Sequence, residues 1–414
     1  MKRVFISDMH IGDGLICDNF IFDDELEQLL LNLSASGETT ELVIVGDGLE
    51  LMESKIVKDL GLVPFEELHD KIDPIVINHI VNNHPKVFNA LSRFCRLNRL
   101  IYVIGNHDYY FHDNPKLQNR FKELIGTPEN IEFVPYFYDK NWGVFAIHGN
   151  NFDPGNRFGK DKKGQLIPPI GDYMTRYMMI HFREVLINGD VPEHIPHDYD
   201  DVQPNMDVFE WFSTMMKTYD MGINLVELWM EELLKMLKTV QAKHWIKSNY
   251  PIAHRFSNLF INSNRGVKFG RILVGLVSKI RSLKRTNYMK TKARTILNRA
   301  IDNPKKYGFQ ERDFYGYCEM PNIDYENLRG LIFAHRHKFE NYLLPSSGQT
   351  RFYINTGTWR TVIERDEKRK GNFLKRFEMA YVLIDDSQDQ LSINAVTQNK
   401  IGTKVSDLFQ KEVV

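Results

Sequence analysis

Features that would point to one compartment or one kind of partner are scarce in this 414-residue chain. Its three cysteines, Cys17, Cys95 and Cys318, are too few and too far apart for a disulfide framework or a cysteine zinc cluster. Lys and Arg (53) nearly balance Asp and Glu (54), so the net charge of −1 indicates no class of partner. No apolar run approaches the roughly 18 residues of a membrane span, and the opening residues read as a strand rather than a signal peptide. We therefore expect a cytoplasmic protein.

Short apolar runs typical of buried strands are present instead. Segments with helical periodicity, such as 22–33 and 77–96, lie between the early runs. Strands that alternate with helices indicate an α/β fold with many parallel pairs. The strand-like runs are 3–7, 41–46, 99–105, 143–149, 330–335, 351–357 and 379–385.

This strand pattern stops near residue 150 and resumes near residue 328. In between, apolar residues recur at three- and four-residue spacing, as at Leu225, Leu228, Trp229 and Leu233, which is a helical pattern. We therefore predict one α/β domain, made of residues 1–155 and 328–414, with a large helical insertion at 156–327.

Polar side chains that can bind metal follow five of the strand-like runs. Ligands of α/β sheets bind at the carboxyl ends of strands, so we expect these side chains to converge. In an extended chain, residues two apart point the same way, so His335 and His337 would face one spot while Arg336 turns away. Seven converging side chains of this kind would bind two divalent metals, with manganese, iron or zinc favoured over calcium or copper(I). They are Asp8, His10, Asp47, Asn106, His148, His335 and His337.

These residues form the motifs D-x-H, G-D, G-N-H-D, H-G and H-x-H, in that order. In this respect residues 1–155 and 328–395 resemble the calcineurin-like metallophosphoesterases. The resemblance implies two packed mixed β-sheets flanked by helices, and a hydrolase in which a hydroxide that bridges two metal ions attacks a phosphoester. Manganese is the first expectation for the ions, with iron or zinc as alternatives. The implied ligands are Asp8, His10 and His337 for one ion and Asn106, His148 and His335 for the other, with Asp47 as the bridge.

His107 matches the family's histidine that is not a metal ligand. The resemblance implies that it donates a hydrogen bond to the phosphate or protonates the leaving oxygen. Such a histidine needs a partner that fixes its tautomer. Glu50 stands at the family's position for this partner, and Asp108 is the alternative. We favour Glu50, because Asp108 would point to the opposite side of an extended chain.

The motifs SDMH, GDGLE and GNHDYYF are most similar to the UDP-2,3-diacylglucosamine pyrophosphatase branch of the family. Enzymes of that branch cover a lipid substrate with a helical insertion. The resemblance therefore implies a phosphodiester or pyrophosphate bond in a nucleotide- or lipid-linked substrate, with the insertion as a lid. That branch typically has arginine in place of His107, and a shorter insertion.

Residues 265–312 are strongly basic, with fourteen Lys and Arg against two acidic residues, a balance of 14 − 2 = +12. Three interpretations are open: an amphipathic helix packed on its own domain, contact with an anionic membrane surface at the membrane periphery, or nucleic-acid binding. The last would make the protein a metal-dependent nuclease. A metal-binding scaffold without catalysis is disfavoured, because every ligand position and His107 are present. The sequence indicates no oligomeric state.

Overall fold

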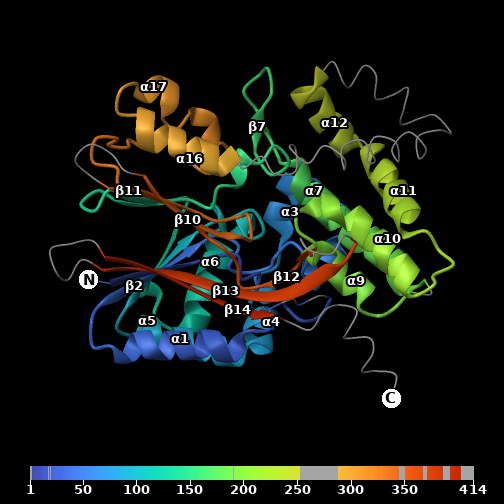
Figure 1. Cartoon of the computed structure of the whole chain (residues 1–414), viewed down its shortest axis with the longest axis horizontal. Coiled ribbons are helices and arrows are strands. Elements are labelled where there is room, and N and C mark those ends of the chain that lie inside the picture. The colour runs from blue at the N-terminus through green and yellow to red at the C-terminus, as the bar shows by residue number, and fades with distance from the viewer. Residues whose placement is uncertain are drawn as a thin grey trace.

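The computed structural model describes residues 2–16, 18, 20–189, 191–251, 288–344, 350–366, 371–385 and 392–401. Helices and mixed sheets make up the chain, so the predicted α/β class is confirmed (Figure 1). None of the described helices is both long and apolar enough to cross a membrane. Cys95 and Cys318 are free thiols, and Cys17 lies outside the described residues.

The larger sheet has seven strands, in the order β12-β13-β1-β2-β3-β4, with β14 also paired to β13. Strands β1 to β4 are parallel, whereas β13 runs antiparallel to β1, β12 and β14. All six residues of β2 are buried, as expected for a parallel strand that is covered on both faces. The strands are β1 (Lys2–Ile6), β2 (Thr40–Val45), β3 (Arg99–Val103), β4 (Ile131–Val134), β12 (Thr361–Arg365), β13 (Phe373–Asp385) and β14 (Ser392–Ile401).

The smaller sheet has five strands, in the order β10-β11-β9-β6-β5. Its central strand β9 is parallel to both β6 and β11, and the two outer pairs are antiparallel. The strands are β5 (Phe137–Asp139), β6 (Val144–Ala146), β9 (Gly330–Phe333), β10 (Phe339–Leu344) and β11 (Arg351–Thr356).

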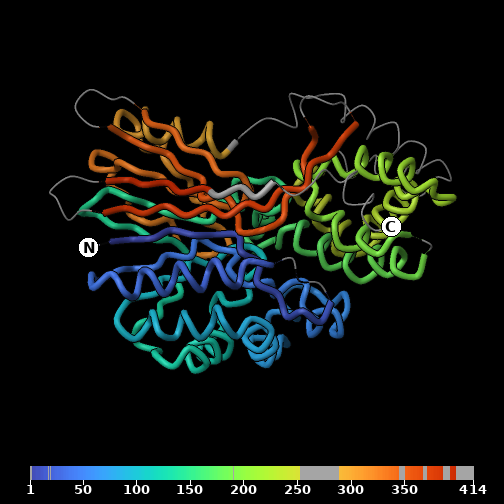
Figure 2. The backbone as a smooth tube through the Cα atoms, turned by 60° about the horizontal axis from the view of Figure 1, so that its bottom comes forward, coloured from blue at the N-terminus to red at the C-terminus, as the bar shows by residue number. Residues whose placement is uncertain are grey.

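The two sheets share one apolar cluster, which includes Phe5 and Val43 of the larger sheet and Ile332 and Ile354 of the smaller. Neighbouring residues on the same strands, such as Val4, point the other way and pack against helices. Helices α1, α4, α5 and α6 cover the larger sheet, and α16 covers the smaller one (Figures 1 and 2). Their bounds are α1 (Asp23–Ala35), α4 (Ile75–Asn83), α5 (Pro85–Cys95), α6 (Pro115–Ile125) and α16 (Tyr288–Arg299); α2 (Lys55–Leu60) and α3 (Phe65–Lys71) precede α4.

The described part of residues 156–327 is mostly helical, with one short hairpin, β7 (Gly159–Lys160) and β8 (Leu166–Ile167). The helices of residues 170–249 gather at one end of the sheets around a core that contains the fully buried Trp211 (Figure 1). Ile363 and Phe373 of the larger sheet belong to the same core, so this bundle is packed onto the sheet. The helices are α7 (Ile170–Tyr177), the π-helical turn η4 (Met178–Phe182), α8 (Arg183–Ile187), α9 (Ile195–Asp198), η5 (Tyr199–Asp201), η6 (Asn205–Asp207), α10 (Val208–Thr218), α11 (Leu225–Leu237) and α12 (Val240–Asn249), followed beyond the undescribed residues by α16, α17 (Pro304–Tyr307) and η7 (Glu311–Phe314).

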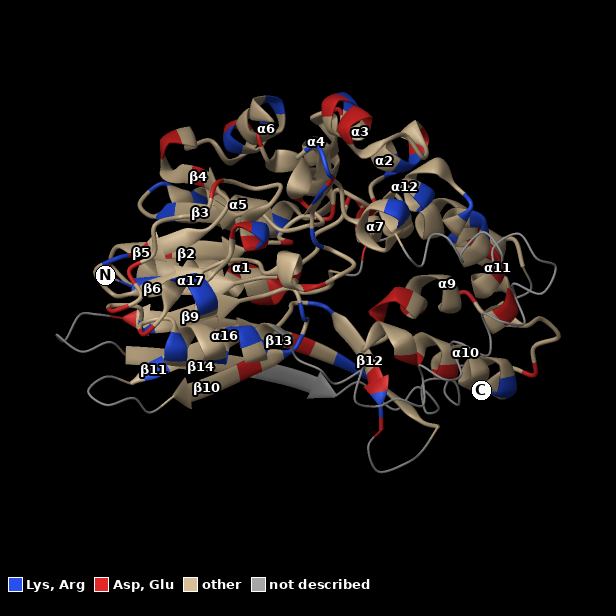
Figure 3. Cartoon of the chain, turned by 90° about the horizontal axis from the view of Figure 1, so that it is seen from above, with Lys and Arg blue, Asp and Glu red and all other residues tan. Residues whose placement is uncertain are grey.

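Only part of the basic segment 265–312 is described, since residues 265–287 lie outside the described residues. Within the described part, α16 packs Ala293 and Leu297 against the smaller sheet. Its Lys and Arg are partly or fully exposed, as are those of α17, and Figure 3 marks their positions along both helices in blue. In this part, Lys292 contacts Asp313 at 3.2 Å, and Lys290 contacts Tyr342. The described portion is therefore an amphipathic helix packed on its own domain.

Candidate metal centre

The predicted ligands lie just beyond the carboxyl ends of β1, β2, β3, β6 and β9. Three groups of side chains that could hold a metal ion form there among the described residues, and within each group the candidate ligand atoms lie within 4.8 Å of one another. One of them, His10 with Glu50 and His107, contains a single predicted ligand, and the other two are made of predicted ligands only. Asp47 belongs to both groups. The first also contains Asp8, His10 and His337, and the second also contains His148 and His335.

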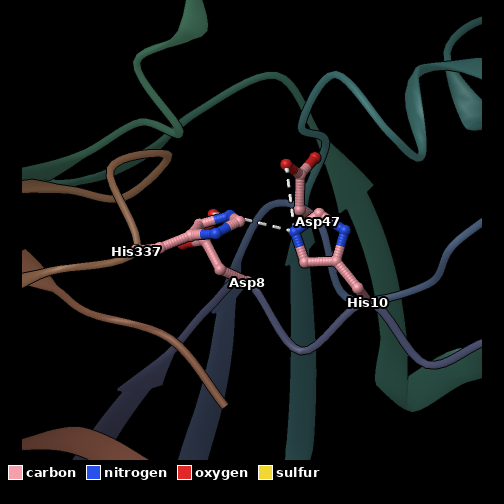
Figure 4. A group of neighbouring side chains, drawn as sticks. All are labelled: Asp8, His10, Asp47 and His337. Atoms are coloured by element: carbon pink, nitrogen blue, oxygen red, sulfur yellow. Dashed lines mark hydrogen bonds and ion pairs between the residues drawn. The ribbon is translucent and has the colours of Figure 1, made fainter. Parts of the chain in front are cut away.

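In the first group the ring nitrogens converge on one point (Figure 4). The Nε2 atoms of His10 and His337 are 3.1 Å apart, and Asp47 Oδ2 is 3.7 Å from His10 Nε2. Asp8 Oδ1 lies 3.3 Å from His337 Nε2. Two neutral imidazoles that face each other in this way can share at most one proton, whereas a cation between them would satisfy both lone pairs. The donor set fits a divalent metal ion.

The second group is built around His148. Its Nδ1 donates to the carbonyl of Val45 at 2.9 Å, so Nε2 is the ring atom that could act as a ligand once it loses its proton. This Nε2 lies 3.1 Å from Asp47 Oδ2 and 3.1 Å from Asn106 Oδ1. The amide oxygen of Asn106 therefore faces the same point as the second group, and with it all seven predicted residues are brought together.

The backbone at these residues is unusual. Among the described residues, seven non-glycine residues have positive φ, and five of them are predicted ligands: Asp8, His10, Asp47, His335 and His337. Left-handed backbone is costly for such residues, and it clusters at functional sites. Backbone hydrogen bonds hold the first two loops together, from the Asp8 amide to Gly46 and from the His10 amide to Asp47.

The local geometry of the H-x-H motif differs from the extended chain that we expected. Strand β9 ends at Phe333, and His335 and His337 have φ of +70° and +51°. The two imidazoles therefore do not face one spot: His335 joins the second group and His337 the first. Arg336, expected to turn away, lies in the lining of the adjoining cavity.

Glu50 is the partner of His107. Its Oε2 lies 2.7 Å from His107 Nδ1 and also 2.9 Å from His10 Nδ1, so one oxygen orients two imidazoles. The alternative, Asp108, was wrong. Its backbone is not extended (φ −112°, ψ 19°), and its buried carboxylate accepts hydrogen bonds from the Gly48 and Gly105 amides and the Tyr102 hydroxyl. Asp108 thus ties together the loops that carry Asp47 and Asn106.

The histidines of the site differ in the direction in which their surroundings shift their pKa. Burial opposes the charged form of His107, but Glu50 and Asp47 outweigh it and raise its pKa to about 10. Burial likewise opposes charging of His148, but Asp47 raises its pKa to about 9. His10 is dominated by burial, helped by the charges of Arg360 and His107, which together lower its pKa to about 3. Without metal, the first group thus already presents His10 as a neutral ligand.

Three further residues were missed by sequence reasoning. Asp153 Oδ2 lies 3.3 Å from His335 Nε2, and the same carboxylate binds Asn156 Nδ2. Glu53 and Arg360 line the adjoining cavity beside His107 and His337. Asp153 follows the H-G motif in a polar turn, and nothing in its spacing marks it as part of the site.

The loop after β11 forms the floor of the site. The hydroxyl of Thr358 donates to the carbonyl of Asp8 at 2.7 Å, and Asn355 Nδ2 donates to the carbonyl of Ala334 at 2.7 Å. These bonds fix the backbone that precedes His10 and His335. Asn355 and Thr358 therefore have a structural role.

A cavity of about 640 Å³ opens from the candidate ligands toward the insertion. At one end it is lined by Asp47, Asn106, His107 and both histidines of the H-x-H motif. Its other walls come mainly from the insertion and are largely apolar. They include Ile170, Met174, Met178, Val202, Met206 and Trp229.

No protein-family model matches this sequence, and no curated protein matches it either.

Proposed function

We propose that this protein is a dinuclear-metal-dependent phosphoesterase of the calcineurin-like kind, which hydrolyses a phosphodiester or pyrophosphate bond. The observation that carries the proposal is that Asp47 belongs to two ligand groups at once. A shared carboxylate is what two dications need in order to be held close together. Two sheets that share one core, with helices outside each, support the same assignment.

Two bound divalent ions, manganese first and iron or zinc as alternatives, would polarise the phosphoryl oxygens and supply a water nucleophile near neutral pH. The protein's own acid is His107. Its Nδ1 is held by Glu50, so Nε2 is the ring atom that is left for the substrate in the cavity. As the bond between phosphorus and the leaving oxygen breaks, Nε2–H donates its proton to that oxygen.

The cavity supports a substrate with a sizeable apolar group. Methionine side chains are adaptable, and Met174, Met178 and Met206 line the cavity together with Trp229. A phosphate held at the metal end would place the rest of the substrate against this wall. We therefore propose a nucleotide- or lipid-linked phosphoester, with the insertion as its cover.

The test is a screen of the manganese-loaded protein against diesters, nucleotide sugars, cyclic nucleotides and oligonucleotides, with metal analysis of the same sample. We expect two ions per chain and hydrolysis of bis-p-nitrophenyl phosphate that chelation abolishes. A preparation that stays metal-free after manganese is offered would contradict the whole proposal. Two bound ions without turnover of any member of the panel would contradict the enzymatic part alone and favour the metal-binding scaffold.

A nuclease is less well supported. In the described part of the basic segment, the side chains of Lys290 and Lys292 already contact Tyr342 and Asp313. Fluorescence anisotropy with labelled DNA and RNA separates the two functions. Binding that weakens steeply with salt would favour the nuclease.

A further inference from the structure

One buried arginine beside the candidate metal centre has no part in the chemistry described so far. Arg360 lies between β11 and β12, in the sequence N-T-G-T-W-R, and is only 7% exposed. It lines the cavity together with Asp47, His107 and His337. Burial lowers the pKa of His10 and His337 in the first ligand group, and the positive charge of Arg360 lowers both further. A cation in this position has to be balanced by anions.

The insertion supplies acidic partners for it. Arg360 Nη2 donates to Asp201 Oδ1 at 2.8 Å and lies 3.7 Å from Asp200 Oδ2, and both carboxylates belong to η5. Arg183 continues the network, 3.6 Å from Asp200 and 3.5 Å from Glu53. The orientation of the Arg360 guanidinium is therefore set by the docking of the insertion on the sheet.

This anchoring uses one edge of the guanidinium. Among the described residues, the partners of Arg360 are all reached through Nη2, and its buried Nε has none. A guanidinium has five N–H donors, so most of its capacity is unused. Guanidinium groups bind phosphate oxygens through paired, charge-assisted hydrogen bonds. A phosphate held at the metal end of the cavity would meet this arginine on the cavity wall.

We propose that Arg360 is a substrate-positioning residue that donates hydrogen bonds to non-bridging phosphate oxygens, with Asp201 of the insertion fixing its orientation. The proposal rests on the proposed phosphoesterase function. In this proposal the insertion covers the substrate and also orients the arginine that binds the phosphate.

The test compares Arg360→Ala, Arg360→Lys and Asp201→Asn in the full chain loaded with manganese. Inorganic phosphate is the probe, titrated calorimetrically, and metal content is measured in each sample. We expect Arg360→Ala to keep both metals and to bind phosphate about 10- to 100-fold more weakly, the range for lost charge-assisted hydrogen bonds. Arg360→Lys should be intermediate, because it keeps the charge and loses the planar fork.

Lys375→Ala is the matched control, since Lys375 pairs with Asp198 of the insertion at 2.8 Å and is not part of the cavity lining. It should leave phosphate affinity unchanged, whereas Asp201→Asn should weaken it. With bis-p-nitrophenyl phosphate, the loss in Arg360→Ala should fall mainly on KM.

Equal phosphate affinity in Arg360→Ala and wild type would overturn the proposal, as would loss of metal from that variant. Equal effects of Asp201→Asn and Lys375→Ala would overturn the anchoring role. If phosphate binding depends on Arg360 but no ester is hydrolysed, this inference stands and the proposed hydrolase function falls.

Discussion

Replacing Asp47 with asparagine tests the shared carboxylate most directly. Its pKa is held well below the usual range, because the charges of His148 and His107 outweigh burial, so the group is ionised near neutral pH. Its Oδ2 lies 3.1 Å from His148 Nε2 and 3.7 Å from His10 Nε2, the atoms where the two ligand groups converge. Two unit charges 4 Å apart at an effective dielectric of 20 interact by about 4 kcal/mol. The substitution should therefore weaken metal binding by at least about 10³-fold.

The assay is calorimetric titration of metal-free protein with Mn²⁺, together with hydrolysis of bis-p-nitrophenyl phosphate. We expect at most one ion bound per chain and no measurable hydrolysis. Asp13→Asn is the control, because Asp13 is equally buried but accepts hydrogen bonds from the amides of Leu15 and Lys55 instead of facing the ligand groups. An Asp47→Asn protein that binds two ions with wild-type affinity would refute the reasoning.

Three further predictions concern proton binding and stability. In metal-free protein, Glu50→Gln should lower the pKa of His107 from about 10, because Glu50 is the group that raises it most; an NMR titration of the imidazole that gives the same value in both proteins would contradict the pairing. The folded pKa of His107 lies above its ordinary value of 6.5, so its contribution to stability is complete below about pH 6.5 and is lost as pH rises toward 10. In urea unfolding across this pH window, the free energy of unfolding should fall more steeply with pH in wild type than in His107→Gln. Equal slopes in the two proteins would contradict the stabilising role of the His107 charge. Trp211→Ala should lower the free energy of unfolding in urea by about 3–5 kcal/mol, because the indole is fully buried in the core of the insertion. Leu97→Ala is the control: Leu97 is 79% exposed, so this change should alter the free energy of unfolding by less than about 0.5 kcal/mol.

Most of the strands that the sequence predicts are buried on both faces. Each of the seven apolar runs falls on a strand, from β1 to β13. The strands that the sequence does not predict are partly exposed. In β10, for example, intermediate and exposed positions alternate along Phe339–Leu344, so no continuous apolar run marks it. Charged residues interrupt the first half of β13 in the same way.

The candidate site was predictable to the extent that its residues directly follow buried strands. Asp8, Asp47 and His148 each stand two residues beyond a strand end, where sheet topology alone brings them together. Arg360 and Asp153 reach the site through loop geometry, and no spacing rule identifies them. The extended-chain argument for His335 and His337 also failed, because periodicity describes strands and both residues lie beyond one.

The left-handed backbone at five of the ligands explains how these loops place their side chains. Each such residue costs on the order of 1–3 kcal/mol and persists only where its surroundings fix it. Here they do: the Asp8 carboxylate accepts the Ser7 hydroxyl at 2.5 Å and the His335 amide at 3.1 Å, and the His107 amide donates to Asp47 at 2.8 Å. The last two of these bonds run between loops that follow different strands, so the fold itself sets the strained conformation. The candidate ligand groups are therefore organised by the fold alone, and binding of a metal there would not bear the cost of bending the chain.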